Sequence, residues 1–283
     1  MEDKKNDTAG GGIEPIQLTG KSRFTFACHK GLSCFTKCCH GMEIILAPYD
    51  ILRLKKNLAM TSGEFLSRHT VNTTHEESGL PLVVLKMKDE ERRPCPFLTE
   101  SGCSVYEDRP SICRYYPIGL ATLRVEKEEE KKGTGEERFY FLVREDHCLG
   151  HGEEKEWTID EWREDQGASR DDEINRDWQS AFLSRALPGQ QRIDPKRQAL
   201  FHLTCYDLDN FRKFVLESPF LEKFEVDRST VEKIRTDDDE LLRFALQYMK
   251  FFMMIEETMK PREGTVENWQ AKQQEILGEA EVD

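Results

Sequence analysis

The chain has 283 residues, of which 37% are hydrophobic, 34% are charged and 10% are aromatic, and its formal net charge is -13. This length suits one large or two modest domains, and the aromatic content predicts that most of the chain folds. The negative charge argues against general nucleic-acid binding, which needs clustered Lys and Arg. The longest apolar block, 251–255, is too short to span a bilayer, and residues 1–20 lack an apolar signal core. We therefore expect a soluble, cytoplasmic protein without a membrane partner.

In chain order, residues 1–21 are polar and glycine-rich, and we expect them to form a flexible tail. Residues 48–58 predict a helix opened by proline at its first position, and a capping box predicts a second helix a few residues later. Residues 80–87 predict a strand, and 119–125 with 138–143 predict a hairpin around the solvated charged loop 126–137. The residues that carry the two helix predictions are Pro48, with Ile51, Leu52 and Leu58 on the buried side, and the capping pair Thr61 and Glu64.

Beyond Glu153 the pattern becomes helical. Thr158 and Glu161 form another capping box, and further helices are predicted at 177–186, 195–217, 229–235 and 237–260. The expected fold class is α+β, with a loop-rich metal-binding domain of short strands and helices followed by an all-helical region. The expected segments are a tail at 1–21, the metal-binding domain at 22–153, a helical region packed on it at 154–262, and a fraying acidic tail at 263–283.

Nine cysteines decide the class of protein. Disulfides are rare in reducing cytoplasm, where a cysteine cluster more often binds metal or performs redox chemistry. The adjacent pair Cys38-Cys39 and the odd total also fit a secreted disulfide framework poorly. Seven of the thiols fall in two runs, 28–39 and 95–113, and thiolates are soft ligands that select zinc, copper(I) or iron–sulfur clusters. The candidate metal ligands are Cys28, Cys34, Cys38, Cys39, Cys95, Cys103 and Cys113, with Cys148 as an eighth.

The spacing of these cysteines suggests more than one metal. Cys34 and Cys38 would share a face of a helical turn, whereas Cys38 and its neighbour Cys39 would diverge by about 100°. Divergence favours two metals or a multinuclear centre, and eight thiols divide into two four-thiolate sites. Cys205 stands alone in a helical run and is interpreted as a buried core residue.

Polar residues beside the cysteines have two interpretations. Arg109 and Arg114 flank Cys113, where their charge could offset an anionic thiolate centre, or they could be ordinary surface residues. Four histidines could be ligands, proton donors or polar neighbours, and we favour polar neighbours for each of them. These histidines are His29, His40, His147 and His151.

The chain resembles the YkgJ-type cysteine-cluster family, which is also described as a zinc- or iron-chelating domain and as iron–sulfur-cluster proteins. The resemblance covers roughly 24–150 and rests on Phe-x-Cys, a group closing in Cys-Cys, Cys-Pro-Phe-Leu, and Cys-x-Val-Tyr-x-x-Arg-Pro-x-x-Cys-Arg-x-Tyr-Pro. It implies metal chelation. One departure is that gaps of five and three residues replace the family's usual Cys-x2-Cys-x2-Cys-Cys spacing. A related branch includes flagellin lysine methylases, although no glycine-rich nucleotide fingerprint stands out.

Three hypotheses follow. The first is an iron centre, in its simplest form an iron–sulfur cluster, that is redox-active and has a protein partner at the helical region. The second is a zinc-stapled interaction protein, because structural zinc contributes directly to folding. The third is a methylase-like modification enzyme with an open coordination position. We favour iron because eight thiols exceed what one structural zinc requires.

Overall fold

The structure is a computed structural model that describes residues 11–13, 17–76, 78–126, 134–179 and 193–263. Its contacts divide the chain into two compact units, each built from two stretches of sequence. The first unit combines Met1–Ile45 with Leu85–Glu173, and the second combines Leu46–Val84 with Ile174–Asp283. The segment 46–84 belongs to the second unit because its helices contact C-terminal helices.

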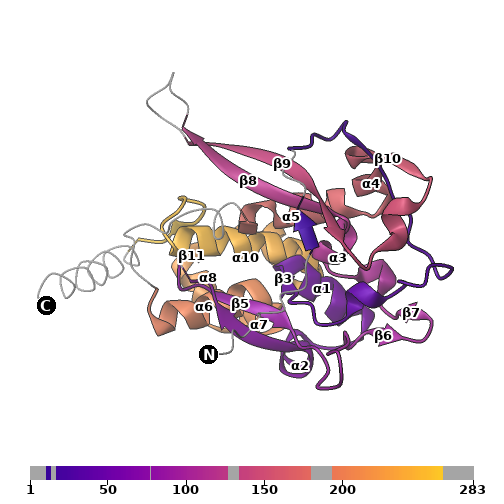
Figure 1. The fold of residues 1–283 in the computed structure, drawn as a ribbon. Helices are drawn as coiled ribbons and strands as arrows, with labels where there is room; N and C mark the ends of the chain where they lie inside the picture. The colour runs from indigo at the N-terminus through magenta and orange to yellow at the C-terminus, as the bar shows by residue number, and fades with distance from the viewer. Residues whose placement is uncertain (1–10, 14–16, 77, 127–133, 180–192, 264–283) are drawn as a thin grey trace, which may run out of the picture. The chain divides into compact units, whose positions relative to one another are not determined.

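Antiparallel strand pairs frame the first unit. The longest pair is β8 (Ile118–Glu126) with β9 (Thr134–Glu145), which confirms the predicted hairpin and extends as a twisted ribbon in Figure 1. β1 (Gly11–Ile13) adds to this hairpin by pairing with β9. β1 lies within the segment 1–21, and its backbone groups have partners on β9. Residues 1–10 and most of the charged loop, 127–133, lie outside the described residues.

Two shorter pairs and several short helices complete the first unit. β2 (Arg23–Thr25) pairs with β10 (Glu156–Thr158), and β6 (Leu98–Thr99) pairs with β7 (Gly102–Cys103). The capping box predicted at Thr158 and Glu161 is present and begins α4. The helices are η1 (Lys37–Cys39), η2 (Tyr106–Asp108), α3 (Ser111–Tyr115), η3 (Leu149–Gly152), α4 (Ile159–Asp165) and α5 (Ala168–Trp178), the last running across the border between the units.

The core of the first unit is aromatic and lies directly beside the cysteine loops. Phe26 is 1% exposed and meets the Trp162 ring edge-on at 5.4 Å. Ile118 and Leu142 from the long hairpin join this core, and Cys148 packs against it as a partly buried side chain. Loops with little regular structure are thereby anchored on a rigid base, which is what a precise ligand site needs.

The second unit begins with a helical pair and a small sheet. α1 (Pro48–Asn57) and α2 (Ser62–His69) form where predicted, and the capping box of Thr61 with Glu64 is present at the start of α2. Ile51 and Leu52 are buried as expected, whereas Leu58 is only half-buried and Leu54 is fully buried instead. A sheet in the order β3-β5-β4 contains β3 (Ile45–Leu46), β4 (Thr70–Thr74) and β5 (Pro81–Leu85), of which β5 confirms the predicted strand.

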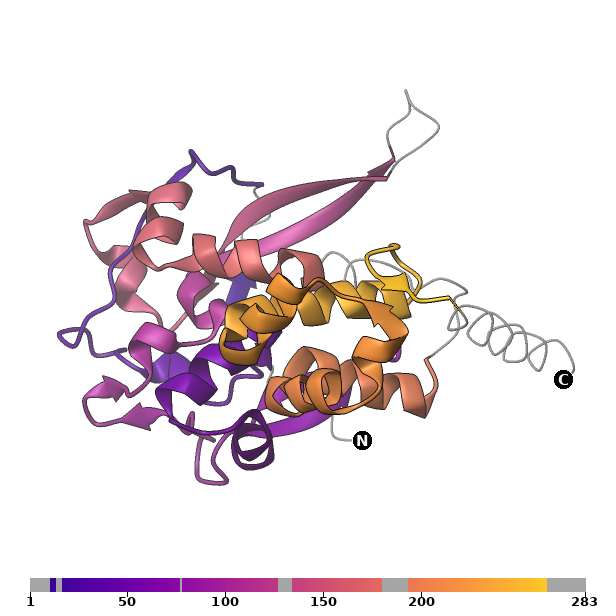
Figure 2. The same ribbon diagram turned by 180° about the vertical axis from the view of Figure 1, so that it is seen from behind.

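The C-terminal part of the second unit is mainly helical (Figure 2). The helix predicted over 195–217 is broken in two at Asp207, and the helix predicted to reach residue 260 ends at Phe252. A short strand pair also departs from the all-helical expectation, and 180–192 and 264–283 lie outside the described residues. The elements are α6 (Pro195–Tyr206), α7 (Leu208–Glu217), α8 (Phe220–Lys223), α9 (Arg228–Thr236), α10 (Asp238–Phe252), and β11 (Phe224–Glu225) paired with β12 (Lys260–Pro261).

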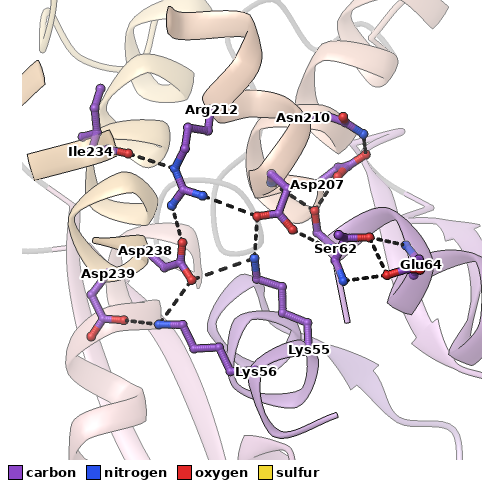
Figure 3. Close-up of polar contacts among 12 residues, drawn as sticks. Lys55, Lys56, Ser62, Glu64, Asp207, Asn210, Arg212, Ile234, Asp238 and Asp239 are labelled. Atoms are coloured by element: carbon purple, nitrogen blue, oxygen red, sulfur yellow. Dashed lines mark hydrogen bonds and ion pairs between the residues drawn. The ribbon is translucent and has the colours of Figure 1, made fainter. Parts of the chain in front are cut away.

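A polar network ties α1 and α2 to α7 and α10 (Figure 3). The Lys55 ammonium lies 2.7 Å from Asp209 Oδ1, and the Ser62 backbone N–H donates to Asp209 Oδ2 at 2.7 Å. The Ser62 hydroxyl donates to Asp207 at 2.5 Å. Arg212 pairs with Asp209 and with the Asp238 carboxylate. In this network the carboxylates of Asp209 and Asp238 each pair with a cationic side chain, so these contacts hold the helices of the second unit together.

Among the described residues, no helix is long and apolar enough to cross a membrane. The predicted fold class is confirmed: the chain mixes short strands and helices in its N-terminal part with helices in its C-terminal part.

Candidate metal centre

All eight candidate ligands lie in the first unit, although they are spread over 121 positions of sequence from 28 to 148. Cys34 is buried, Cys28 is exposed, and the other six are half-buried. Cys205 lies in the second unit and is 0% exposed, which confirms its interpretation as a core residue. Burial alone raises the pKa of the Cys205 thiol well above its usual range, so the thiol stays protonated.

Three cysteines gather where the loop after β2 meets η3. The Ala27 N–H donates to the Gly150 carbonyl at 3.1 Å, which places Cys28 beside the turn that carries Cys148. The Leu149 N–H donates to the Cys34 sulfur at 3.3 Å. Desolvation first, and then the negative charges of Cys38, Cys34 and Cys148 in that order, together raise the pKa of Cys28 to about 11. These three sulfurs are therefore electrostatic neighbours of Cys28.

The predicted helical turn shared by Cys34 and Cys38 is not formed. Thr36 has φ 68°, a left-handed conformation that interrupts the turn, and η1 begins only at Lys37. Adjacent residues of a 3-10 helix are about 120° apart around its axis, yet the side chains of Cys38 and Cys39 are close to each other. Their side chains are hydrogen-bonded to each other, and this bond is the main cause that lowers the pKa of Cys38 and raises that of Cys39.

A second group forms around the hairpin of β6 and β7. The Cys95 N–H donates to the Cys39 carbonyl at 2.8 Å, and His40 forms an antiparallel bridge with Pro94. Cys103 pairs with Leu98, three residues after Cys95, which brings the two ends of the loop together. After the bond to Cys38 and burial, the charges of Cys38, Cys95 and Cys113 raise the pKa of Cys39 in that order. Cys113, on α3, is therefore also an electrostatic neighbour of Cys39.

Several sulfurs receive hydrogen bonds from the backbone. Burial raises the pKa of the Cys95 thiol, but the N–H groups of Phe97 and Leu98 act to lower it by donating to the sulfur. Cys103 shows the same opposition between burial and the Val105 N–H. Donors directed at sulfur stabilise the thiolate form, which is the form that binds metal.

The two arginines beside Cys113 are not surface residues, because Arg109 is 7% and Arg114 is 5% exposed. Arg114 donates to the Gln166 carbonyl at 2.7 Å and to the Arg109 carbonyl at 3.1 Å, and it pairs with Asp171. These contacts connect the segment that carries α3 to Gln166 and Asp171. Arg109 stacks over the Tyr106 ring at 4.0 Å, and its charge lowers the pKa of Cys103 against the larger effect of burial.

The four nearby histidines each have a partner other than a cysteine. His29 Nε2 lies 3.2 Å from Glu153, and His147 Nε2 lies 3.5 Å from Glu145. His40 and His151 each have a ring nitrogen near a backbone carbonyl, at 3.2 Å from Thr36 and at 3.1 Å from Val143 respectively. This arrangement favours the interpretation as polar neighbours.

Tyr116 is a site residue that sequence reasoning missed. Its hydroxyl donates to Glu145 Oε2 at 3.0 Å and is hydrogen-bonded to the Cys148 thiol, while its ring meets Phe26 at 5.9 Å. Burial first, then the bond to Cys148, raises the pKa of Tyr116 above its usual range, so the phenol remains a donor. The Tyr-Pro step at the end of the cysteine motif was the available signal.

Residues 27–149 match the model of the CxxCxxCC family, described as "Putative zinc- or iron-chelating domain". This part of the chain is similar to that domain, which we call the CxxCxxCC domain below. The match begins one residue before Cys28 and ends one residue after Cys148, so all eight candidate ligands lie inside it. The resemblance identified from the sequence is confirmed, and metal chelation by zinc or iron is the function that it assigns to this domain. No curated protein and no solved structure matches the chain.

The donor set of the CxxCxxCC domain fits zinc or iron by its chemistry, because it consists of soft thiols with hydrogen-bond donors directed at their sulfurs. Within the described ranges, no three His, Cys, Asp or Glu side chains are already arranged around one point as a metal site. Thiolates without a metal repel one another, and closure of the ligands is coupled to metal binding. The fold thus brings the thiols into one unit without arranging three of them around a single point.

Proposed function

We propose that the CxxCxxCC domain holds iron through thiolates, in its simplest form as an iron–sulfur cluster, and that the centre is redox-active. The proposed ligands are Cys28, Cys34, Cys38, Cys39, Cys95, Cys103, Cys113 and Cys148. The observation that carries this proposal is that all eight thiols belong to one unit, whereas Cys205 belongs to the other. When bound, such a cluster supplies one-electron redox chemistry.

Two features support iron over a single structural zinc. One structural zinc needs four ligands, and eight thiols are twice that number. Hydrogen bonds to sulfur are also among the means by which proteins set the potential of an iron–sulfur cluster. In this unit they reach Cys34 from Leu149 and Cys95 from Phe97 and Leu98. A cytoplasmic location belongs to the same proposal, because reducing conditions keep thiols available.

The experiment is metal analysis with absorption spectroscopy of the full chain purified without oxygen. We expect iron and a coloured sample. Cys113→Ala should lower the iron content, whereas the matched variant Cys205→Ala should retain it, because Cys205 lies in the other unit. Circular dichroism of both variants controls for folding. Loss of iron in Cys205→Ala but not in Cys113→Ala would overturn the ligand assignment.

Zinc is the second candidate, because the family description names it together with iron. A zinc-stapled chain would be colourless, would contain stoichiometric zinc, and would lose structure when a chelator removes the metal. A colourless sample that contains zinc and no iron would refute the cluster proposal.

A further inference from the structure

We propose that Asp171 is a positioning residue of the metal centre, because it fixes the helix α3 that carries the thiol of Cys113. This inference rests on the proposed function only in that Cys113 binds a metal, and it holds for iron and zinc alike. Asp171 lies on α5, beyond the stretch 27–149 that matches the family model. The arrangement of the centre then depends on a residue outside the matched stretch.

The helix α3 is five residues long and is held along one face. Successive residues of an α-helix are about 100° apart, so Ser111, Arg114 and Tyr115 share a face. The side chains of all three are bound to carboxylates of α5. Cys113 lies on the other side of α3, because it is about 200° from Ser111 and about 100° from Arg114 around the axis. The packing of α3 on α5 therefore sets the position of the Cys113 sulfur.

Asp171 is the carboxylate that joins two of these side chains. It is 1% exposed, and its Oδ2 lies 3.1 Å from Arg114 Nε and accepts a hydrogen bond from the Ser111 hydroxyl at 3.2 Å. Arg114 is buried as well, so each of the two charges depends on the other for compensation. Asp171 thus binds the residues that flank Cys113 in the sequence, two positions before it and one position after it.

Arg114 extends this constraint to the backbone around α3. Its guanidinium donates to the carbonyls of Arg109 at 3.1 Å and Gln166 at 2.7 Å, and also to the carbonyl of Glu107. The chain passes close to this group at Gly167, which has φ 69° and where an added Cβ would lie 3.0 Å from Arg114 Nη1. A shift of the Arg114 side chain would break several of these bonds together, so the carboxylate of Asp171 has a fixed partner.

The neighbouring carboxylate, Asp172, holds the end of α3. It accepts a hydrogen bond from the Tyr115 hydroxyl and another from Arg163 at 2.6 Å. Trp162 Nε1, on α4, donates to the Tyr115 carbonyl at 3.3 Å. Two adjacent carboxylates of α5 therefore hold α3, and Asp171 is the one whose partners lie on both sides of Cys113 in the sequence.

The test compares Asp171→Asn with Glu173→Gln in the metal-free, reduced full chain, which is titrated with cobalt(II). Both substitutions exchange a carboxylate of α5 for an amide of the same shape, but Asp171 is buried and Glu173 is exposed. Thiolates bound to cobalt absorb in the near ultraviolet, and this absorption grows with the number of thiolates bound. We expect Asp171→Asn to bind cobalt about tenfold more weakly and to lose part of this absorption, as Cys113→Ala does. Glu173→Gln should keep both.

Circular dichroism and urea unfolding of the metal-free chains control for folding. A purely structural role would lower the unfolding midpoint of Asp171→Asn and leave the spectrum of the bound cobalt unchanged, and this result overturns the proposal. If Asp171→Asn does not fold, Ser111→Ala takes its place, because it removes only the hydroxyl bound to Asp171. The same loss of absorption is then expected, and an unchanged spectrum overturns the proposal.

Failure of the iron proposal is observed separately, in the metal content of the purified chain. A chain that is isolated with zinc and no iron refutes iron and leaves the cobalt comparison intact. An unmodified chain that takes up no cobalt overturns metal binding by the thiols, and the role of Asp171 with it.

Discussion

Replacing Lys55 by Met should destabilise the second unit much more than replacing its neighbour Lys56 by Met. Both lysines lie on α1 and pair with Asp238, but the side chain of Lys55 is 6% exposed and that of Lys56 is 51% exposed. The Lys55 ammonium also lies 2.7 Å from the Asp209 carboxylate. The substitution conserves length and approximate volume, so it tests the charge.

The expected loss follows from burial. Removing one partner of a buried ion pair costs about 3–5 kcal/mol, because the remaining charge is left without compensation. Here Asp209 keeps the Ser62 N–H and Arg212, and Asp238 keeps Arg212 and Lys56. We therefore expect the lower end, about 3 kcal/mol, for Lys55→Met. An exposed pair contributes about 0.5 kcal/mol, which is the loss expected for Lys56→Met.

Urea unfolding followed by the circular dichroism of the helices measures both losses, at equal metal content and with two-state behaviour checked by a second probe. The difference between the two variants should be about 2.5 kcal/mol. A difference smaller than about 1 kcal/mol would refute the reasoning, because Arg212 and the backbone would then suffice to compensate both carboxylates.

Two further predictions concern pH and the metal centre. Burial would raise the pKa of Asp209, but hydrogen bonds from Lys55 and Ser62 outweigh it and leave the pKa below its usual range, as for Asp238 with Arg212. Since the pKa of each carboxyl is lower in the folded state, the stabilisation is complete above about pH 4 and is lost as pH falls through the folded pKa. The loss of stability caused by Lys55→Met should therefore become smaller when the urea titrations are repeated at acidic pH. A loss that stays constant with pH would contradict this reasoning. Tyr116→Phe keeps the ring but removes the hydroxyl that is hydrogen-bonded to Cys148, and in chelator competition it should weaken metal retention about tenfold. Tyr106→Phe, at a residue 54% exposed, should not weaken it; equal retention in both variants would contradict a role for the phenol.

Local signals in the sequence predicted local structure well. The capping boxes at Thr61 and Thr158 depend on side chains three residues apart, and both are present. The helix break at Asp207 was not predicted, because this residue is held by Ser62, which lies 145 positions away. The burial of Lys55 was missed for the same reason, since its partner Asp209 is 154 positions distant.

The candidate site was likewise predictable from the sequence only in part. The cysteine motif identified the thiols and the family, because composition and spacing are properties of the sequence itself. Which thiols are neighbours depends on contacts such as Ala27 with Gly150 and Cys39 with Cys95, which arise only when distant loops pack. The expected helical turn at Cys34 was wrong because a left-handed Thr36 interrupts it.

The discontinuous second unit has a consequence for how the metal domain can be isolated. The family match, 27–149, includes α1 and α2, whose contacts with α6, α7 and α10 come from residues beyond 195. A fragment cut at the homology boundaries would leave Ile51, Leu52 and Leu54 facing water and Lys55 without Asp209. The stretch that matches the family model and the compact units of the fold therefore have different boundaries, and a fragment in which α1 and α2 keep their packing partners must include the C-terminal helices.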